Sequence, residues 1–244
     1  MDYNKNLFEI IYIDDASNDL SKQIYTSFEL SVHKQFFQFS KNKGRVFATQ
    51  KGIQLARGDW ILLLQSNVVV FPNIINKYID IINNYDSVAF AGKINYETDD
   101  MRFENYLNHP KRGLNSTNNS MLINYENLLF GNCIIKKSIF QKIPLNLNLK
   151  YYGGEELDFS YRLNQKYPKM IRYSQKSIVI RKSHPSFQTH LLRLEEFGSK
   201  NLLFLNAPLQ KKVLKIPFLL NNNFINRKII KVLSFILLFI YNMK

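Results

Sequence analysis

The apolar run Trp60–Leu64 is predicted to be a buried strand, and it ends in two amides, Gln65 and Asn67. Polar groups at the carboxyl end of a strand lie where open α/β sheets bind their ligands. Hard cations such as magnesium prefer carboxylate oxygens, whereas amide oxygens can act as ligands but bring no charge. A ligand site at this strand end would therefore have low affinity for a divalent cation. The alternative is that these residues only form a polar strand end.

Carboxylates occupy two similar positions elsewhere in the chain. Asp14 and Asp15 follow the apolar run Phe8–Ile13, a second predicted strand, and Glu155 and Glu156 begin a predicted helix. A carboxylate that stays ionised and reaches a hydroxyl group can act as a general base. The alternative roles are structural, because Asp15 can cap the following helix and a helix dipole stabilises glutamates in its first turn.

Strand and helix patterns alternate around these residues, which favours parallel βαβ units in an α/β domain. Leu20, Ile24 and Phe28 lie four residues apart and predict one apolar helix face. Residues 95–127 are polar and irregular, as in a functional or disordered loop. Strands are expected at 8–13, 36–39, 60–64, 68–71, 88–91, 132–135 and 177–180, and helices at 20–28, 44–56, 74–82, 138–143, 155–166 and 190–205.

The segment from Asn42 to Leu64 resembles the nucleotide-sugar glycosyltransferases of family two, which have the GT-A fold. The resemblance extends over about residues 7–205. It implies a three-layer α/β domain of GT-A type over residues 1–205, with a mostly parallel central sheet. Residues 206–244 are expected to form a helical tail that is first basic and then apolar.

In that family, the strand that corresponds to Trp60–Leu64 runs into an Asp-x-Asp motif, which holds a divalent cation on the diphosphate of the sugar nucleotide. Gln65 and Asn67 replace both carboxylates here. The loss of two formal negative charges makes a divalent cation doubtful, and no metal ligand is assigned. Two interpretations follow: lysine or arginine neutralises the diphosphate without a metal, or transferase activity has been lost.

Further residues are assigned to nucleotide binding by the same resemblance. Asp14 or Asp15 is expected to accept a hydrogen bond from the nucleotide base. The family's diphosphate-binding arginine is absent, and Arg45 or Lys51 is in a position to compensate for it. His184 aligns with a histidine that helps to bind the cation or the diphosphate, although a lone histidine is often structural.

The segment from Tyr152 to Leu163 resembles the family motif that carries the general base of inverting enzymes. The resemblance implies that Glu156 deprotonates the acceptor hydroxyl, with Glu155 and then Asp158 as the other candidates. Asp158 and Arg162 are four residues apart, so a surface ion pair is the structural alternative.

The implied function is transfer of a sugar from a nucleotide-sugar donor, expected to be a UDP-sugar, to a glycan or lipid-linked acceptor with inversion. The first alternative is a non-catalytic GT-A-like protein that binds sugar nucleotides or partners. The second is a basic nucleic-acid-binding protein, since the net charge of +14 attracts phosphate in any form. No helix-turn-helix, zinc-finger or RNA-binding signature supports the second alternative, so no nucleic acid is expected as a partner.

The two ends of the chain carry further expectations. No secretory pattern follows Met1, which predicts a cytoplasmic location. Relatives begin with a strand and a helix before the strand at Phe8, which points to a truncated gene model or a degraded copy. Near the other end, basic residues precede the apolar run Val232–Tyr241, which is too short to span a bilayer. That run is expected either to lie on anionic lipid at the inner face of the membrane or to pack on the domain or a second copy.

Overall fold

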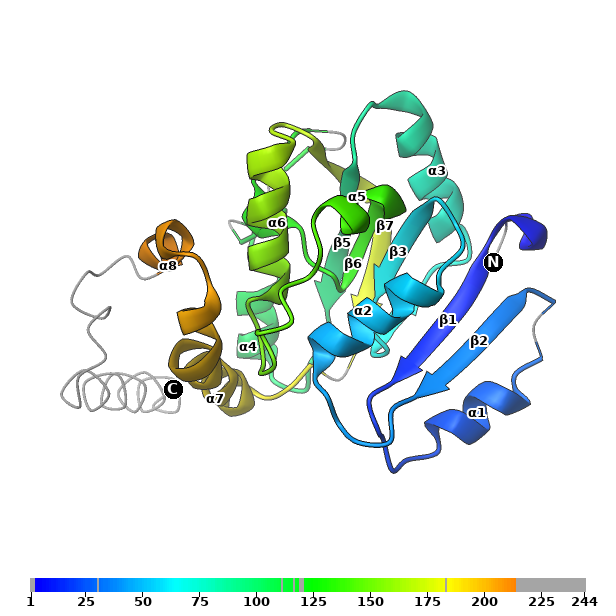
Figure 1. Ribbon diagram of the computed structural model, residues 1–244, viewed down its shortest axis with the longest axis horizontal. Helices are drawn as coiled ribbons and strands as arrows, with labels where there is room; N and C mark the ends of the chain where they lie inside the picture. The colour runs from blue at the N-terminus through cyan, green and yellow to red at the C-terminus, as the bar shows by residue number, and fades with distance from the viewer. Residues whose placement is uncertain are drawn as a thin grey trace.

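The computed structural model describes residues 3–29, 31–110, 112–115, 117–118, 121–182 and 184–213. The apolar run of the predicted tail therefore lies outside the described residues. The strands are β1 (Glu9–Asp14), β2 (His33–Gln38), β3 (Trp60–Leu64), β4 (Val68–Val70), β5 (Ala89–Tyr96), β6 (Asn132–Lys136) and β7 (Ile171–Arg181). The α-helices are α1 (Ser21–Ser27), α2 (Arg45–Leu55), α3 (Ile74–Asn84), α4 (Met101–Leu107), α5 (Lys137–Lys142), α6 (Glu155–Lys166), α7 (Phe187–Glu196) and α8 (Ala207–Val213), and Figure 1 shows their arrangement.

Five strands form the main sheet in the order β3-β6-β5-β7-β4. Only β5 and β7 are parallel neighbours in it, and the other three pairs are antiparallel. The expectation of a mostly parallel sheet is therefore wrong, and the sheet is mixed. Alternation of strands and helices predicts parallel pairs where one helix carries the chain back to the starting edge. Between β5 and β6, α4 and a long irregular segment replace such a crossover, and β6 enters the sheet at the end where β5 leaves it.

Helices cover both faces of this sheet, which confirms the predicted three-layer α/β architecture (Figure 1). On one face, α3 packs against Phe90 of β5, Ile134 of β6 and Val179 of β7. On the other face, α2, α5 and α6 pack against the neighbouring residues of the same strands, such as Ala91 and Cys133. Successive residues of a strand point to opposite faces of the sheet, so the short apolar runs of β5 and β6 contribute side chains to the cores on both faces.

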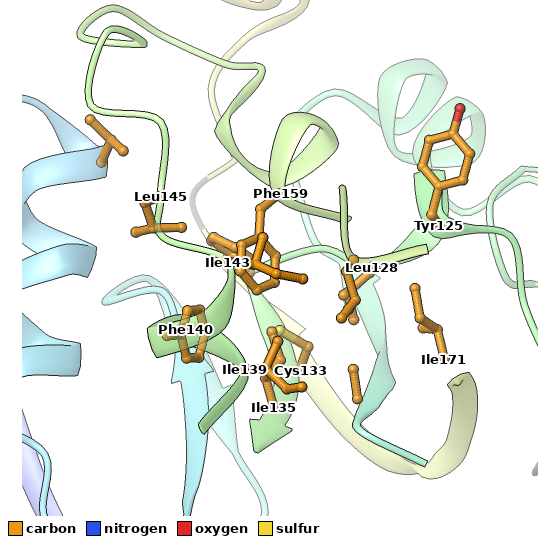
Figure 2. Packing of buried hydrophobic residues seen from close by; sticks show 14 of the residues in the cluster. Tyr125, Leu128, Cys133, Ile135, Ile139, Phe140, Ile143, Leu145, Phe159 and Ile171 are labelled. Atoms are coloured by element: carbon orange, nitrogen blue, oxygen red, sulfur yellow. The ribbon is translucent and has the colours of Figure 1, made fainter. Parts of the chain in front are cut away.

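The second of these layers holds α6 firmly on the sheet. Figure 2 shows Phe159 of α6 among the buried side chains of α5 and β6. Its ring stacks on Phe140, with the ring centroids 4.9 Å apart, and lies edge-on to Phe130 at 5.6 Å. Such aromatic pairs contribute about 0.5–1.5 kcal/mol each beyond the burial of their area. The first turn of α6, which carries two glutamates, is thereby fixed relative to β6.

The strands β1 and β2 form a separate parallel pair. Among the described residues, no ladder of hydrogen bonds joins β1 to β3. The helix α2 bridges the two sheets instead, because it contacts β1 and also contributes Val46 and Ile53 to the core of the main sheet (Figure 1).

The helix α1 packs on this two-stranded sheet with a different face from the predicted one. Tyr25 contacts the ring of Tyr12 at 5.6 Å. The predicted apolar face of Leu20, Ile24 and Phe28 is about 60% exposed. Leu20 and Phe28 flank α1 instead of lying within it, and the two-stranded sheet leaves all three side chains uncovered.

Two segments are more regular than expected. The strands β5 and β7 extend several residues beyond their predicted apolar cores, and their register shifts between Gly92 and Lys93. The helix α4 lies in the segment that is predicted to be irregular, where Asp100 caps it through the main-chain N–H groups of Arg102 and Phe103. With only seven residues, α4 leaves too short a pattern to be recognised.

The helix α8 begins within the predicted tail and packs on the domain. Its Leu209 is buried in the main core, and Lys212 contacts Glu126 at 2.7 Å. The proposed boundary after residue 205 stays a prediction. Within the described part of the chain, no helix has the length and apolarity needed to cross a bilayer.

Candidate functional site

Two glycines in left-handed conformations set the start of α6. Gly153 has a φ of +85° and Gly154 a φ of +94°, which L-residues with side chains rarely adopt. A Cβ atom on Gly154 would also lie 2.7 Å from Cε2 of Phe197. The tight turn directs Glu155 and Glu156 into the first helical turn, where the dipole of α6 stabilises negative charge.

Arg45 lies between these two glutamates. Its guanidinium donates to Glu155 through Nε and to Glu156 through Nη2, at 3.2 Å in the second case. The same guanidinium lies over the ring of Tyr152 at 5.3 Å. Burial lowers the pKa of Arg45, but the attraction of both carboxylates outweighs it and raises that pKa above its ordinary value. Sequence analysis assigned Arg45 to diphosphate binding, whereas the structure shows it paired with the predicted general base.

The Glu156 carboxylate combines burial with hydrogen bonding. Desolvation raises its pKa, and the Arg45 guanidinium and a hydrogen bond from the main-chain N–H of Phe130 act against that rise. The net pKa lies above the ordinary value for a glutamic acid, so this carboxylate is a stronger base than an exposed one. The neighbouring Glu155 is 3% exposed, and its Oε2 has no hydrogen-bond partner among the described residues.

Gln65 lies beside the same stretch of chain. A Cβ atom on Gly131 would lie 3.6 Å from Cδ of Gln65, and Gly131 follows Phe130, whose N–H bonds to Glu156. The structure thus brings the end of β3 and the start of α6 together. The Oε1 atom of Gln65 is buried and has no hydrogen-bond partner within the described residues.

Asn67 lies where β4 meets the end of β7. Its main-chain oxygen accepts a hydrogen bond from the N–H of Lys182 at 3.1 Å. The two amides of Gln65 and Asn67 are uncharged, and in the described part of the chain no three His, Cys, Asp or Glu side chains are placed to hold a metal ion. These residues do not fit the divalent cation that the family motif holds, because a hard cation prefers anionic oxygens.

Asp14 and Asp15 both hold the main chain in place. Asp14 is buried and accepts hydrogen bonds from Ser17 and, at 2.9 Å, from Nε2 of Gln38. Asp15 accepts from the N–H groups of Lys43 and Gly44 at 2.7 and 2.8 Å. These last bonds fasten the end of β1 to the residues before Arg45, so Asp15 also positions that side chain. A role in binding the base stays a prediction for both.

His184 lies just beyond β7, in an aromatic environment. Its ring contacts Tyr96 and Phe103 edge-on at centroid distances of 5.2 and 5.3 Å. Burial is the largest effect on His184, and together with the positive charges of Arg181 and Arg193 it lowers the pKa of that imidazole to about 4, against the hydrogen bond to the Pro185 carbonyl. The imidazole is therefore neutral at neutral pH. Being neutral, it adds no positive charge to the site.

Three arginines that sequence analysis missed act on His190, whose ring lies 6.2 Å from that of His184. Arg181 ends β7, Arg193 lies in α7, and Arg112 follows α4. All three lower the pKa of His190, after the larger effect of burial. Their spacing along the chain carries no signal, because they come from three separate elements. The net charge of +14 was the one hint of such a cluster.

The third catalytic candidate does not join the group. Asp158 accepts two hydrogen bonds from Arg162, at 2.9 and 2.6 Å. At about 100° per residue, Asp158 lies about 160° around the helix from Glu156. Asp158 and Arg162 line an open cavity of about 400 Å³ together with Phe204. That cavity lies on the side of α6 facing away from Glu156, and the geometry favours the ion pair with Arg162, although Asp158 is buried and not on the surface.

Comparisons with known proteins agree on one family. The family model described as glycosyl transferase family 2 matches residues 2–144. A protein of Mycoplasma pneumoniae described as an uncharacterized glycosyltransferase is 37% identical over 87 residues, which is 34% of this chain and 29% of that protein. The glycosyltransferase GlyG of Streptococcus pneumoniae is 30% identical over 101 residues, or 41% of this chain and 34% of GlyG. The matched segments thus span about a third of the length of these relatives.

Solved structures show the same fold at low sequence identity. A fragment of TarS from S. aureus superposes with a TM-score of 0.60 at 16% identity, covering 87% of this chain and 62% of the fragment. The same fragment has been solved with UDP and with UDP-GlcNAc. GalNAc-T7, solved with UDP, GalNAc and Mn²⁺, superposes with a TM-score of 0.53 at 18% identity. This match covers 78% of this chain and 42% of the GalNAc-T7 chain.

Proposed function

This chain belongs to glycosyl transferase family 2 and has the GT-A fold, and on that premise we propose that it transfers a sugar from a UDP-sugar to a glycan or lipid-linked acceptor. In the proposed reaction, Glu156 takes the proton of the acceptor hydroxyl while the oxygen attacks the anomeric carbon. The bond from that carbon to the diphosphate breaks, its electron pair leaves with UDP, and the anomeric centre is inverted.

The observation that carries this proposal is the position of Glu156. Its carboxylate lies at the start of α6, bonded to the N–H of Phe130 and next to the end of β3 through Gln65. Carboxyl ends of strands are where ligands bind in open α/β sheets. Burial raises its pKa, which suits a group that must accept a proton near neutral pH.

The UDP-sugar donor is proposed from the solved relatives. TarS has been solved with UDP and UDP-GlcNAc, and GalNAc-T7 with UDP. Both share the fold of this chain at less than 20% identity.

One contact favours the non-catalytic alternative. Arg45 pairs with both Glu155 and Glu156, and this pairing lowers the pKa of Glu156 against the larger effect of burial and occupies the carboxylate. In the catalytic proposal, Arg45 instead keeps Glu156 ionised and oriented until the acceptor hydroxyl arrives. The two proposals differ in whether the protein releases UDP from a bound donor.

Release of UDP tests the proposal directly. We expect the full chain to bind UDP-GlcNAc or another UDP-sugar in calorimetry and to release UDP slowly in a coupled assay, with water as a surrogate acceptor. A mixture of lipid-linked glycans is expected to accelerate release. Binding without any release would favour the non-catalytic protein, and the lack of both would refute the sugar-nucleotide proposal.

An acceptor carried by a lipid would place the protein at a cytoplasmic membrane surface, and we propose the basic and apolar tail as its contact. Apolar area and lysine charge both contribute to interfacial binding. The full chain is expected to sediment with anionic vesicles at low salt and to be released by salt or by deletion of Arg227–Lys244. Intact protein that stays in the supernatant at low salt would contradict this contact.

A further inference from the structure

The strand ends near Gln65 carry positive charge in place of the missing carboxylates. Arg181 is the last residue of β7 and pairs with Val68 of β4 and Tyr96 of β5. The next residue donates its N–H to the carbonyl of Asn67, so Arg181 lies beside one of the two amides. Its charge acts on Tyr96, on Glu156 and on both imidazoles, after the larger effect of burial in each case.

Arg193 and Arg112 come from other elements, and their charges act on the same His190 imidazole as the charge of Arg181. The Arg193 guanidinium lies 4.6 Å from the ring centre of Tyr152, the same ring that Arg45 contacts. Arg112 donates to the carbonyl of Leu107 and lies over the ring of Tyr106 at 4.9 Å. Arg181 thus lies at the strand end where β4, β5 and β7 meet, and the charges of all three arginines act on the His190 imidazole.

The three arginines form no ion pair with a carboxylate in the described part of the chain. Within the described residues, none of Arg181, Arg193 and Arg112 has an acidic partner within 4.0 Å. The nearby carboxylates of Glu155 and Glu156 are paired with Arg45. The Nε atom of Arg181 is buried and has no hydrogen-bond partner in the described part of the chain. A buried donor on a charged group is costly unless an acceptor satisfies it, so this cluster is suited to an anion.

We propose that Arg181, Arg193 and Arg112 hold the diphosphate of the donor in place of a divalent cation. This inference rests on the proposed function, since it concerns the leaving group of that reaction. Guanidinium groups match phosphate oxygens with paired hydrogen bonds, and their fixed charge stabilises the negative charge that develops as the anomeric bond breaks. A cation at the same place would meet three positive charges and two uncharged amides.

Calorimetry with UDP as the probe tests this assignment. We expect the full chain to bind UDP in the presence of EDTA, with no gain in affinity when manganese replaces EDTA. Arg181→Gln and Arg193→Gln should each weaken UDP about tenfold to a hundredfold, whereas binding of uridine should not change. Arg181→Lys keeps the charge without the paired donors and should lie between the wild type and the glutamine variant.

Arg57→Gln is the matched control, because it removes the same charge from an exposed side chain that pairs with Glu9 at the far end of β1. It should bind UDP as the wild type does, and thermal melts should show that all variants fold. Tight UDP binding only with manganese, or equal UDP affinity in the Arg181 and Arg193 variants, would overturn this inference and leave the proposed function standing. No binding of UDP or UDP-sugar under any condition would overturn both.

Discussion

Replacement of Glu156 by glutamine is expected to lower kcat about 10²- to 10⁴-fold while donor affinity stays nearly unchanged. Glutamine keeps the shape of the side chain and can still accept the N–H of Phe130, but it cannot take a proton from the acceptor hydroxyl. The loss should therefore appear in the chemical step and not in the binding of UDP-sugar. Single-turnover rates, measured beside calorimetric affinities, separate the two.

The pH dependence of activity provides a second test of the Glu156→Gln variant. Burial raises the pKa of Glu156 above 4.5, and below its pKa the group is protonated and cannot act as a base. Activity should fall as the pH drops through that raised pKa, and Glu156→Gln should lack this acid limb. Asp158→Asn is the control, since that carboxylate lies about 160° around α6. Full turnover in Glu156→Gln would move the role to Glu155.

Replacement of Gly92 by alanine is expected to destabilise the protein by about 3 kcal/mol, or roughly 6–12 °C in Tm. A Cβ atom there would lie 2.5 Å from the carbonyl oxygen of Ser177 and closer still to the Tyr78 hydroxyl and the Asn132 amide. These groups form a buried network in which Asn132 accepts from Tyr78 at 2.7 Å and donates to Ser177 at 2.9 Å. Overpacking and broken hydrogen bonds therefore act together.

Gly198→Ala is the matched control for this prediction. A Cβ atom at Gly198 meets no atom within 4 Å, and its backbone is not in a left-handed conformation. Its melting temperature should stay within about 2 °C of the wild type, because surface changes away from special features cost little. Equal melting temperatures for the Gly92 and Gly198 variants would show that the sheet relaxes around the new methyl group.

The sequence predicts local elements well where one pattern decides them. The bounds of α6 and β3 agree with expectation, because a glycine pair precedes the one and five apolar residues make up the other. The family and the three-layer fold are confirmed. Helical spacing could not say that Leu20, Ile24 and Phe28 lack a covering partner, since that depends on distant parts of the chain.

Residues of the candidate site can be predicted from the sequence only where they lie in a segment that resembles a family motif. Resemblance singles out Glu156 and Gln65, and the structure brings both to the stretch from Phe130 to Gly131. Their roles stay predictions. The pairing of Arg45 with Glu156 joins residues 111 positions apart, and no spacing rule reports such a contact.

The division of the strands into two sheets bears on how the molecule loses its structure. Cooperative unfolding requires that each part depends on the others, and here α2 is the described element that packs against both sheets. The pair of β1 and β2 has little buried apolar area and an exposed helix face on α1, so its opening costs less than global unfolding. A single melting temperature then reports chiefly on the unfolding of the five-stranded sheet. Asp15 follows β1 and holds the main chain just before Arg45, so the position of Arg45 depends on the less stable two-stranded sheet.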